Sequence, residues 1–285
     1  MKIRVADYLA SMLYDAGGED VFMVTGGMIM FLTDAVYQHD HMKHICCHHE
    51  QAAVMAAEAY GRYSNKLGVA YVTAGPAALN TLNSVVGALV DRSPCIVVAG
   101  QSKVSQARVT TPRQFALQGF NTLPIFEKVT KYAVMLDDIA TVKYSMEKAI
   151  HTAKSHPVGP VWIECPIDIQ AATFDPDDYD GFSPEEDTSS QIEIKDKFSL
   201  VNEAIRNAKR PCILAGPGVR LAGAVESFNR IVQKLNIPVL TSRLGMDLMG
   251  HHNPLFIGRP GTYGDRPANF TIQNSDLLLT IGCRL

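Results

Sequence analysis

The chain has 285 residues, of which 47% are hydrophobic and 19% charged, so it can fill the cores of about two globular domains. The net charge is −3 and the positive charges are scattered, which argues against nucleic-acid and membrane-surface partners. No apolar run is long enough to span a bilayer, and residues 1–7 lack the apolar segment of a secretory signal. The six cysteines mostly lie in apolar runs without a C-x-x-C pair, which favours a reducing compartment. We therefore expect a cytoplasmic protein.

In the first 170 residues, helical and extended patterns alternate. Most of the predicted strands are continuous apolar runs, which is typical of a parallel sheet covered on both faces, and the pattern therefore predicts an α/β doubly wound domain. In chain order, the predicted elements are a helix over 5–16, a strand over 21–24, a helix over 28–38, a strand over 43–47, a helix over 50–62, a strand over 69–73, a helix over 77–90, a strand over 95–99, a helix over 137–153 and a strand over 160–165.

Ligands of such folds bind at the carboxyl ends of the strands. Four loops follow predicted strands here, and we expect them to converge on one rim. They comprise residues 25–27, 48–50, 73–76 and 100–101. The segment after the last of them, 102–118, is polar and longer than an ordinary connection, and loops of that kind are often functional.

Composition changes after the first domain. Residues 174–190 include seven acidic residues and two prolines but no lysine or arginine, so we expect a linker over 176–194 between domains at 1–175 and 195–285. The second domain repeats the α/β rhythm with helices over 198–208 and 222–235 and strands over 211–215, 238–241 and 276–281. The chain ends at Leu285 directly after what reads as an interior strand. We therefore expect this second domain to be incomplete, or completed by something else.

Three local motifs allow more than one interpretation. Glu50 follows a predicted strand and begins a helix, where the macrodipole favours any carboxylate, so the simplest interpretation is a solvated helix-start glutamate. The histidines and cysteines between residues 41 and 49 fit no zinc spacing and lack the second histidine of H-E-x-x-H, so we expect no metal site. Gly216 and Gly218 indicate either a tight turn or a nucleotide pocket. The second option leaves open a non-catalytic nucleotide- or partner-binding module.

Taken together, the loop motifs resemble the thiamine diphosphate-dependent enzymes of the acetolactate synthase type. The resemblance covers essentially the whole chain, and it depends on the order and spacing of the motifs rather than on any single one. The matching segments are Val21-Phe22 with Thr25-Gly26-Gly27, His49-Glu50-Gln51-Ala52-Ala53, Ala59-Tyr60-Gly61-Arg62, Thr73-Ala74-Gly75-Pro76 with Asn80, Gly87-Ala88 with Asp91 and Pro94, Gly100-Gln101, Gln118, Lys131, Pro238-Val239-Leu240-Thr241, Gly258, Gly261, Ala268-Asn269, Ser275-Asp276-Leu277-Leu278 and Ile281-Gly282-Cys283-Arg284.

The resemblance implies that residues 1–175 form the family's pyrimidine-binding domain and that most of its central domain follows. It implies that Glu50 hydrogen-bonds the aminopyrimidine ring of thiamine diphosphate and activates the cofactor, which needs a water-poor site. Gln118 would face the substrate from the partner subunit. The pyrimidine pocket would be lined by Thr25, Gly26, Thr73, Pro76 and Asn80.

The resemblance also implies a 2-oxo acid substrate, with pyruvate as the expected donor, and assembly as a homodimer or homotetramer. The family's third domain binds the diphosphate through Mg²⁺. It is missing here, so the chain would be inactive without that domain in a further segment or a separate chain. FAD is bound by the central domain of some relatives and is a further candidate cofactor. An alternative is a truncated product with an assembly role.

The chain departs from the family pattern at several loop positions. Thr25 stands where proline is usual, Ala77 replaces a glycine and Leu79 a threonine. Leu117 and Gly119, beside Gln118, replace an aromatic residue and an acid. These changes affect the substrate side more than Glu50.

Overall fold

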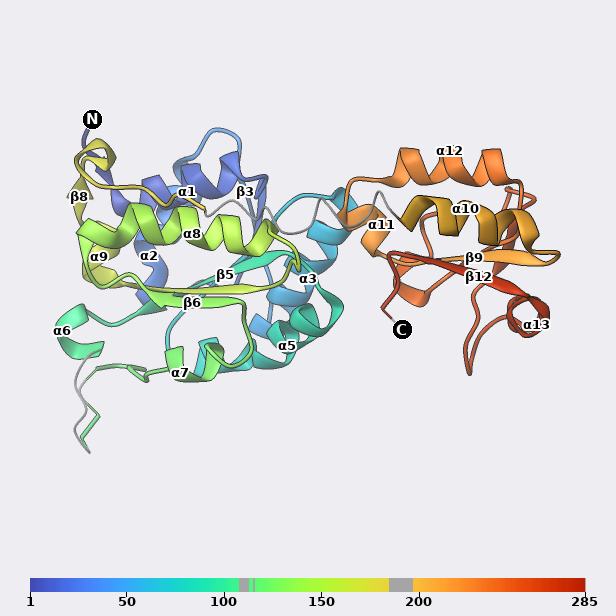
Figure 1. Cartoon of the computed structure of the whole chain (residues 1–285). Helices are drawn as coiled ribbons and strands as arrows, with labels where there is room; N and C mark the ends of the chain where they lie inside the picture. The colour runs from blue at the N-terminus through green and yellow to red at the C-terminus, as the bar shows by residue number, and fades with distance from the viewer. Residues whose placement is uncertain (108–112, 115, 185–196, 285) are drawn as a thin grey trace. The chain divides into compact units, whose positions relative to one another are not determined.

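The computed structural model describes residues 1–107, 113–114, 116–184 and 197–284 (Figure 1). The chain divides into two compact units, Met1–Pro184 and Glu185–Leu285. Each unit is built on a parallel sheet with helices packed against it, which confirms the predicted α/β class. Among the helices that the structure describes, none has the length and apolar character needed to cross a membrane.

The first unit contains a six-stranded sheet in the order β3-β2-β4-β5-β7-β6, and every neighbouring pair is parallel. Its strands are β2 (Asp20–Met23), β3 (Lys43–Cys46), β4 (Gly68–Val72), β5 (Cys95–Gln101), β6 (Tyr132–Met135) and β7 (Val161–Pro166). The short strands β1 (Ile3–Arg4) and β8 (Thr173–Phe174) pair antiparallel. Strand β6 was not predicted, because this edge strand is short and only half-buried.

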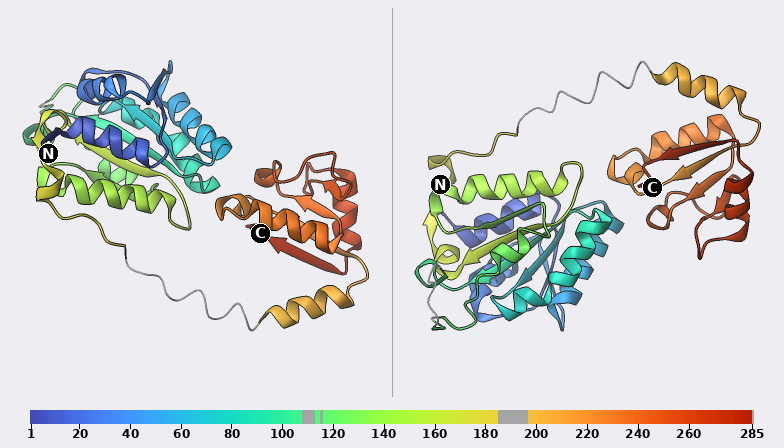
Figure 2. Two further views of the ribbon diagram at one scale, coloured as in Figure 1. Left: turned by 90° about the horizontal axis from the view of Figure 1, so that it is seen from above. Right: turned by 60° about the horizontal axis from the view of Figure 1, so that its bottom comes forward.

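Helices cover both faces of this sheet (Figures 1 and 2). Along β4 the side chains alternate, with Val69 and Tyr71 in one core and Ala70 and Val72 in the other, so both faces are buried. The first core is completed by α1 (Val5–Asp15), α2 (Met30–Gln38), α8 (Val142–Lys154) and α9 (Ile167–Ala171), and the second by α3 (Glu50–Ser64), α4 (Pro76–Asn80), α5 (Leu82–Asp91) and α7 (Leu123–Phe126).

Three predicted elements differ in the structure. The single helix expected over 77–90 is divided at Thr81, whose backbone N–H and hydroxyl both bond the carbonyl of Ala78 and so end α4. The helix expected from 137 begins only at Val142, after a 3₁₀ turn over Ile139–Thr141. Strand β3 is not a buried run, since it lies at the edge of the sheet and all its residues are exposed. The polar segment after β5 includes the short helix α6 (Val104–Ala107).

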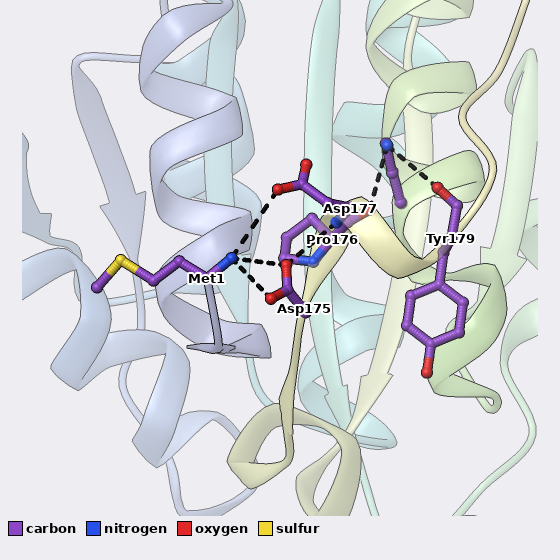
Figure 3. Close-up of polar contacts among 6 residues, drawn as sticks. Met1, Asp175, Pro176, Asp177 and Tyr179 are labelled. Atoms are coloured by element: carbon purple, nitrogen blue, oxygen red, sulfur yellow. Dashed lines mark hydrogen bonds and ion pairs between the residues drawn. The ribbon is translucent and has the colours of Figure 1, made fainter.

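Residues 176–184, which composition assigns to a linker, belong to the first unit. Figure 3 shows the contacts of Asp175, Pro176, Asp177 and Tyr179 at the start of this stretch. The N-terminal ammonium group is 2.7 Å from Asp175 Oδ1, and Asp175 begins the 3₁₀ turn Pro176–Asp178. Lys143 Nζ on α8 donates to the carbonyls of Pro176 and Tyr179, each at 3.1 Å. The rest of the expected linker, 185–194, lies outside the described residues.

The second unit has a four-stranded parallel sheet in the order β11-β10-β9-β12. Phe228 and Val232 of helix α12 (Val225–Leu235) pack into the core on one face of the sheet. Their spacing follows the helical period, which is why the sequence predicted this helix. Strand β11 and helix α13 were not predicted, because β11 has only 3 residues and ends at Gly258, and α13 has only 9 residues with Pro267 in its first turn. The elements are β9 (Pro211–Ala215), β10 (Val239–Thr241), β11 (Phe256–Gly258), β12 (Leu277–Ile281), α10 (Phe198–Asn207), α11 (Gly218–Leu221), α12 (Val225–Leu235) and α13 (Arg266–Asn274).

Candidate functional site

The carboxyl ends of the parallel strands in the first unit lie along one side of the sheet, called the carboxyl edge below. The loops after β2, β3, β4 and β5 are therefore brought together there. Contacts between these loops join the predicted site residues in pairs. The sequence predicted this arrangement because each of these loops follows a predicted strand of one parallel sheet. Close backbone approach at Gly26 and Gly75, together with the side-chain amide of Asn80, decides which residues meet there.

Glu50 is the first residue of α3, directly after the loop that follows β3. His49 caps the helix, with its Nδ1 accepting a hydrogen bond from the Gln51 N–H at 3.1 Å. Asn80, at the end of α4, donates from Nδ2 to Glu50 Oε2 at 2.9 Å, although the two residues are 30 apart in sequence. The structure thus gives Glu50 a defined orientation from a neighbouring loop, beyond what an isolated helix start provides. Its side chain remains partly exposed.

The loops after β2 and β4 meet at Thr73. Its hydroxyl accepts a hydrogen bond from the Met28 N–H at 3.3 Å, and the side chain is 8% exposed. Gly26 lies directly against it, since a Cβ atom at this position would come within 2.6 Å of Thr73 Cβ. Thr25, the preceding residue, is exposed on the same rim. Glycine at position 26 is therefore required by the close approach of the two loops.

The loops after β4 and β5 meet at Gly75 and Gln118. Gly75 has a φ of +61°, and a Cβ there would come within 2.1 Å of the Gln118 carbonyl oxygen. Gln118 also has a positive φ, 57°, and its side chain is exposed. Pro76 begins α4 next to Gly75 and is exposed as well. All seven residues predicted for the site therefore lie on this one edge.

The sequence did not predict a buried polar cluster that is centred on Glu164. Glu164 on β7 is 1% exposed, and its Oε1 accepts hydrogen bonds from Trp162 Nε1 at 3.2 Å and from the Thr122 hydroxyl. Its Oε2 accepts from Gln101 Nε2 at 3.2 Å. The indole of Trp162 stacks on Phe126, with centroids 3.5 Å apart. The one sequence feature that could have indicated this cluster is the acidic residue Glu164 inside the apolar run 161–165.

Burial raises the pKa of the Glu164 carboxyl, while the hydrogen bonds from Thr122, Trp162 and Gln101 lower it, and the net direction is upward. Between the ordinary pKa of a glutamate and this raised value, the folded chain holds a proton that the unfolded chain has released. The contribution of this group to stability is therefore full below the ordinary pKa and is lost as the pH rises through the raised one.

Trp162 is the only tryptophan, so its fluorescence reports this titration directly. We expect the emission maximum to shift on acidification with a midpoint above 4.5, the ordinary value of the glutamate pKa, because protonation changes an acceptor of the indole N–H. The measurement is a fluorescence titration of the folded chain from pH 8 downward. In Glu164→Gln the transition should disappear, and a transition that persists in this variant would assign it to another group.

In the second unit, the glycines of the 216–218 turn have a packing reason. A Cβ on Gly216 would come within 2.4 Å of the Gly282 carbonyl oxygen, and one on Gly218 within 2.8 Å of Gly282 Cα. Close contact between the loops after β9 and β12 therefore explains both residues, which favours the tight-turn interpretation. At the same edge the buried hydroxyls of Thr241 and Ser242 have no hydrogen-bond partner within the described part of the chain.

The histidine-rich stretch shows ring contacts. His39 and His41 lie against the ring of Tyr14, with centroids at 4.8 and 5.8 Å. Over the described ranges, no three His, Cys, Asp or Glu side chains come together as a metal-binding group.

Comparison with known proteins identifies the family. The model described as "Thiamine pyrophosphate enzyme, N-terminal TPP binding domain" matches residues 3–131, and the model described as "Thiamine pyrophosphate enzyme, central domain" matches residues 199–285. The chain belongs to the thiamine pyrophosphate enzyme family. The first match includes every residue predicted for the site, from Thr25 to Gln118.

Within this family, the chain is similar to large subunits of acetolactate synthase. It is 34% identical to a probable acetolactate synthase large subunit of Methanococcus aeolicus over 93% of this chain and 44% of the relative. It is 30% identical to the acetolactate synthase isozyme 2 large subunit of Escherichia coli K12, over 98% of this chain and 49% of the relative. The chain thus spans about half the length of the curated relatives it matches.

Proposed function

We propose that this chain forms the N-terminal part, or one subunit, of a thiamine diphosphate-dependent 2-oxo acid decarboxylase or carboligase of the acetolactate synthase type, with pyruvate as the expected donor. The observation that carries the proposal is the hydrogen bond from Asn80 to Glu50, which orients a carboxylate at the carboxyl edge of the sheet. The acetolactate synthase large subunits similar to this chain support the reaction class.

The residues of the edge fit the pyrimidine half of the cofactor. Thiamine diphosphate, when bound, supplies the electron sink needed to break and form the bond beside the carbonyl of a 2-oxo acid. Glu50 would share a proton with the aminopyrimidine ring, and Asn80 keeps one of its carboxylate oxygens in place. Thr25, Gly26, Thr73 and Pro76 would line the pocket, and the exposed Gln118 side chain would be available to the substrate.

The partly exposed Glu50 needs further shielding to act in this way, because water around a carboxylate favours full ionisation. We propose that the bound ring and the diphosphate-binding part of the family, which holds Mg²⁺, complete the site. That part would be in a further segment or a separate chain, so the chain alone should be inactive. We also propose a homodimer or homotetramer, supported by exposed apolar side chains on α3 and α5, namely Met55, Tyr63, Val86 and Val90. A cytoplasmic location is proposed on the cysteine pattern alone.

FAD is the candidate ligand of the second unit. The support is local, since the buried hydroxyls of Thr241 and Ser242, which have no hydrogen-bond partner among the described residues, lie where the strands of this sheet end. A buried hydroxyl without a partner costs stability, and a polar ligand that displaced the atoms covering these hydroxyls would provide one. We expect FAD to raise the melting temperature of the chain, with Thr241→Val reducing the increase.

Isothermal titration tests the main proposal. Thiamine diphosphate and Mg²⁺ are titrated into the chain mixed with a diphosphate-binding polypeptide of the same family, and then into each component alone. We expect Mg²⁺-dependent binding and pyruvate turnover in the mixture only. If no mixture turns over pyruvate while the chain binds a nucleotide such as FAD, the result would favour the non-catalytic module and contradict the proposal.

A further inference from the structure

Segment 102–121 connects β5 to α7, and the structure describes its residues 102–107, 113–114 and 116–121. Gln101 is the last residue of β5, and Thr122 directly precedes α7. Both residues are buried, at 2% and 1% exposure, although the segment between them is polar. Both donate to the same carboxylate, that of Glu164. One buried side chain therefore joins the two ends of the segment.

Gln101 extends this junction into the segment itself. Its Nε2 donates both to Glu164 Oε2 and to the carbonyl of Phe120 at 3.1 Å, while its Oε1 accepts from the Ser102 N–H at 2.9 Å. Ser102 is 1% exposed, so this bond is shielded from water. The amide of Gln101 thus has one orientation that satisfies all three contacts, and Glu164 is one of the two acceptors of its Nε2.

In its ionised form, Glu164 acts only as an acceptor at this site. All three partners of Glu164 reach it with N–H or O–H donors, and an ionised carboxylate has no donor of its own. A glutamine at position 164 would turn its NH₂ either toward Gln101 Nε2 or toward the Trp162 N–H, which can only donate. With Trp162 and Gln101 in their present orientations, either choice places two donors against each other, so the amide does not reproduce all the contacts of the carboxylate.

The position of this segment determines where Gln118 lies. Gln114 Nε2 donates to the carbonyls of Ala116 and Gly119, at 2.6 and 2.7 Å, and shapes the turn around Gln118. The Gln118 carbonyl in turn lies against Gly75 in the loop after β4. We propose that Glu164 is a positioning residue, which joins both ends of segment 102–121 and thereby sets Gln118 against Gly75 at the candidate site. The contact of Gln118 with substrate rests on the proposed function, but the positioning itself does not.

The test uses hydrogen exchange of the full chain and needs no activity. The informative amides are those of Ser102, which bonds Gln101 Oε1, and Gly119, which bonds the Ala116 carbonyl. In Glu164→Gln we expect these two amides to exchange roughly tenfold faster or more, the change expected when the loss of the Glu164 contacts weakens the segment by about the net value of one hydrogen bond. Amides of β4 and α8, away from the segment, should keep their protection.

Two controls separate positioning from general destabilisation. Glu58→Gln changes another poorly exposed carboxylate of the same unit, which accepts from Ser93 and Arg62 and makes no hydrogen bond to the described residues of the segment, so it should leave both amides unchanged. Thr122→Val removes one of the donors while keeping the volume, and should accelerate exchange partially, whereas Thr122→Ser should restore it. The fluorescence of Trp162 should change in Glu164→Gln but not in Glu58→Gln.

Unchanged exchange at Ser102 and Gly119 in a folded Glu164→Gln variant would overturn the proposal. If that variant does not fold, Thr122→Val carries the test, and unchanged exchange there would equally overturn it. Because neither readout involves the cofactor, a failure of the proposed reaction would leave these results as they are. In an active assembly, Glu164→Gln should lower kcat while leaving thiamine diphosphate affinity near that of the unchanged chain.

Discussion

Glu50→Gln is expected to reduce pyruvate turnover by roughly 10²- to 10⁴-fold in an assembly that holds thiamine diphosphate, the range typical of a lost general acid–base group. The physical reason is that glutamine keeps the shape of the side chain and one acceptor for Asn80, but cannot share a proton with a ring nitrogen. The measurement is steady-state turnover on pyruvate together with isothermal titration of the cofactor.

Glu58→Gln is the matched control, because it makes the same change two turns further along the same helix, away from the edge of the sheet. Its turnover should remain close to that of the unchanged chain. If Glu50→Gln retains both turnover and cofactor affinity, the role assigned to Glu50 would be falsified.

Gly75→Ala is expected to lower the free energy of unfolding of the first unit by about 2 kcal/mol, through the strain of a left-handed backbone and the contact with the next loop. The added Cβ would come within 2.1 Å of the Gln118 carbonyl oxygen, so either the loop after β4 or the segment carrying Gln118 must shift. Urea denaturation measures the stability. Hydrogen exchange at Gly119 shows whether the segment has moved.

Gly87→Ala provides the comparison. Gly87 lies inside α5 with no atom within 4 Å of an added Cβ and no positive φ, so alanine should stabilise the helix slightly, by about 0.5–1 kcal/mol. Equal effects of the two substitutions would show that the contact between Gly75 and Gln118 contributes nothing in solution.

The parallel sheet could be predicted because its central strands are buried on both faces and read as continuous apolar runs. Strand β6 was missed, since an edge strand loses one neighbour and its residues are only half-buried. The break at Thr81 was also missed, because a hydroxyl that bonds the Ala78 carbonyl is a local choice that apolar periodicity does not register.

The amino-acid sequence by itself determined the α/β class, the strand ends that carry the candidate site and, through ordered motifs, membership of the thiamine pyrophosphate enzyme family. Only the tertiary structure decided which of those residues touch. Asn80 donates a hydrogen bond to Glu50, and the Gln118 carbonyl lies against Gly75. Glu164 accepts hydrogen bonds from two segments more than 40 residues away in the chain. Periodicity reports which face of an element is buried, whereas a hydrogen bond between distant loops depends on strand order and register, which no local pattern encodes.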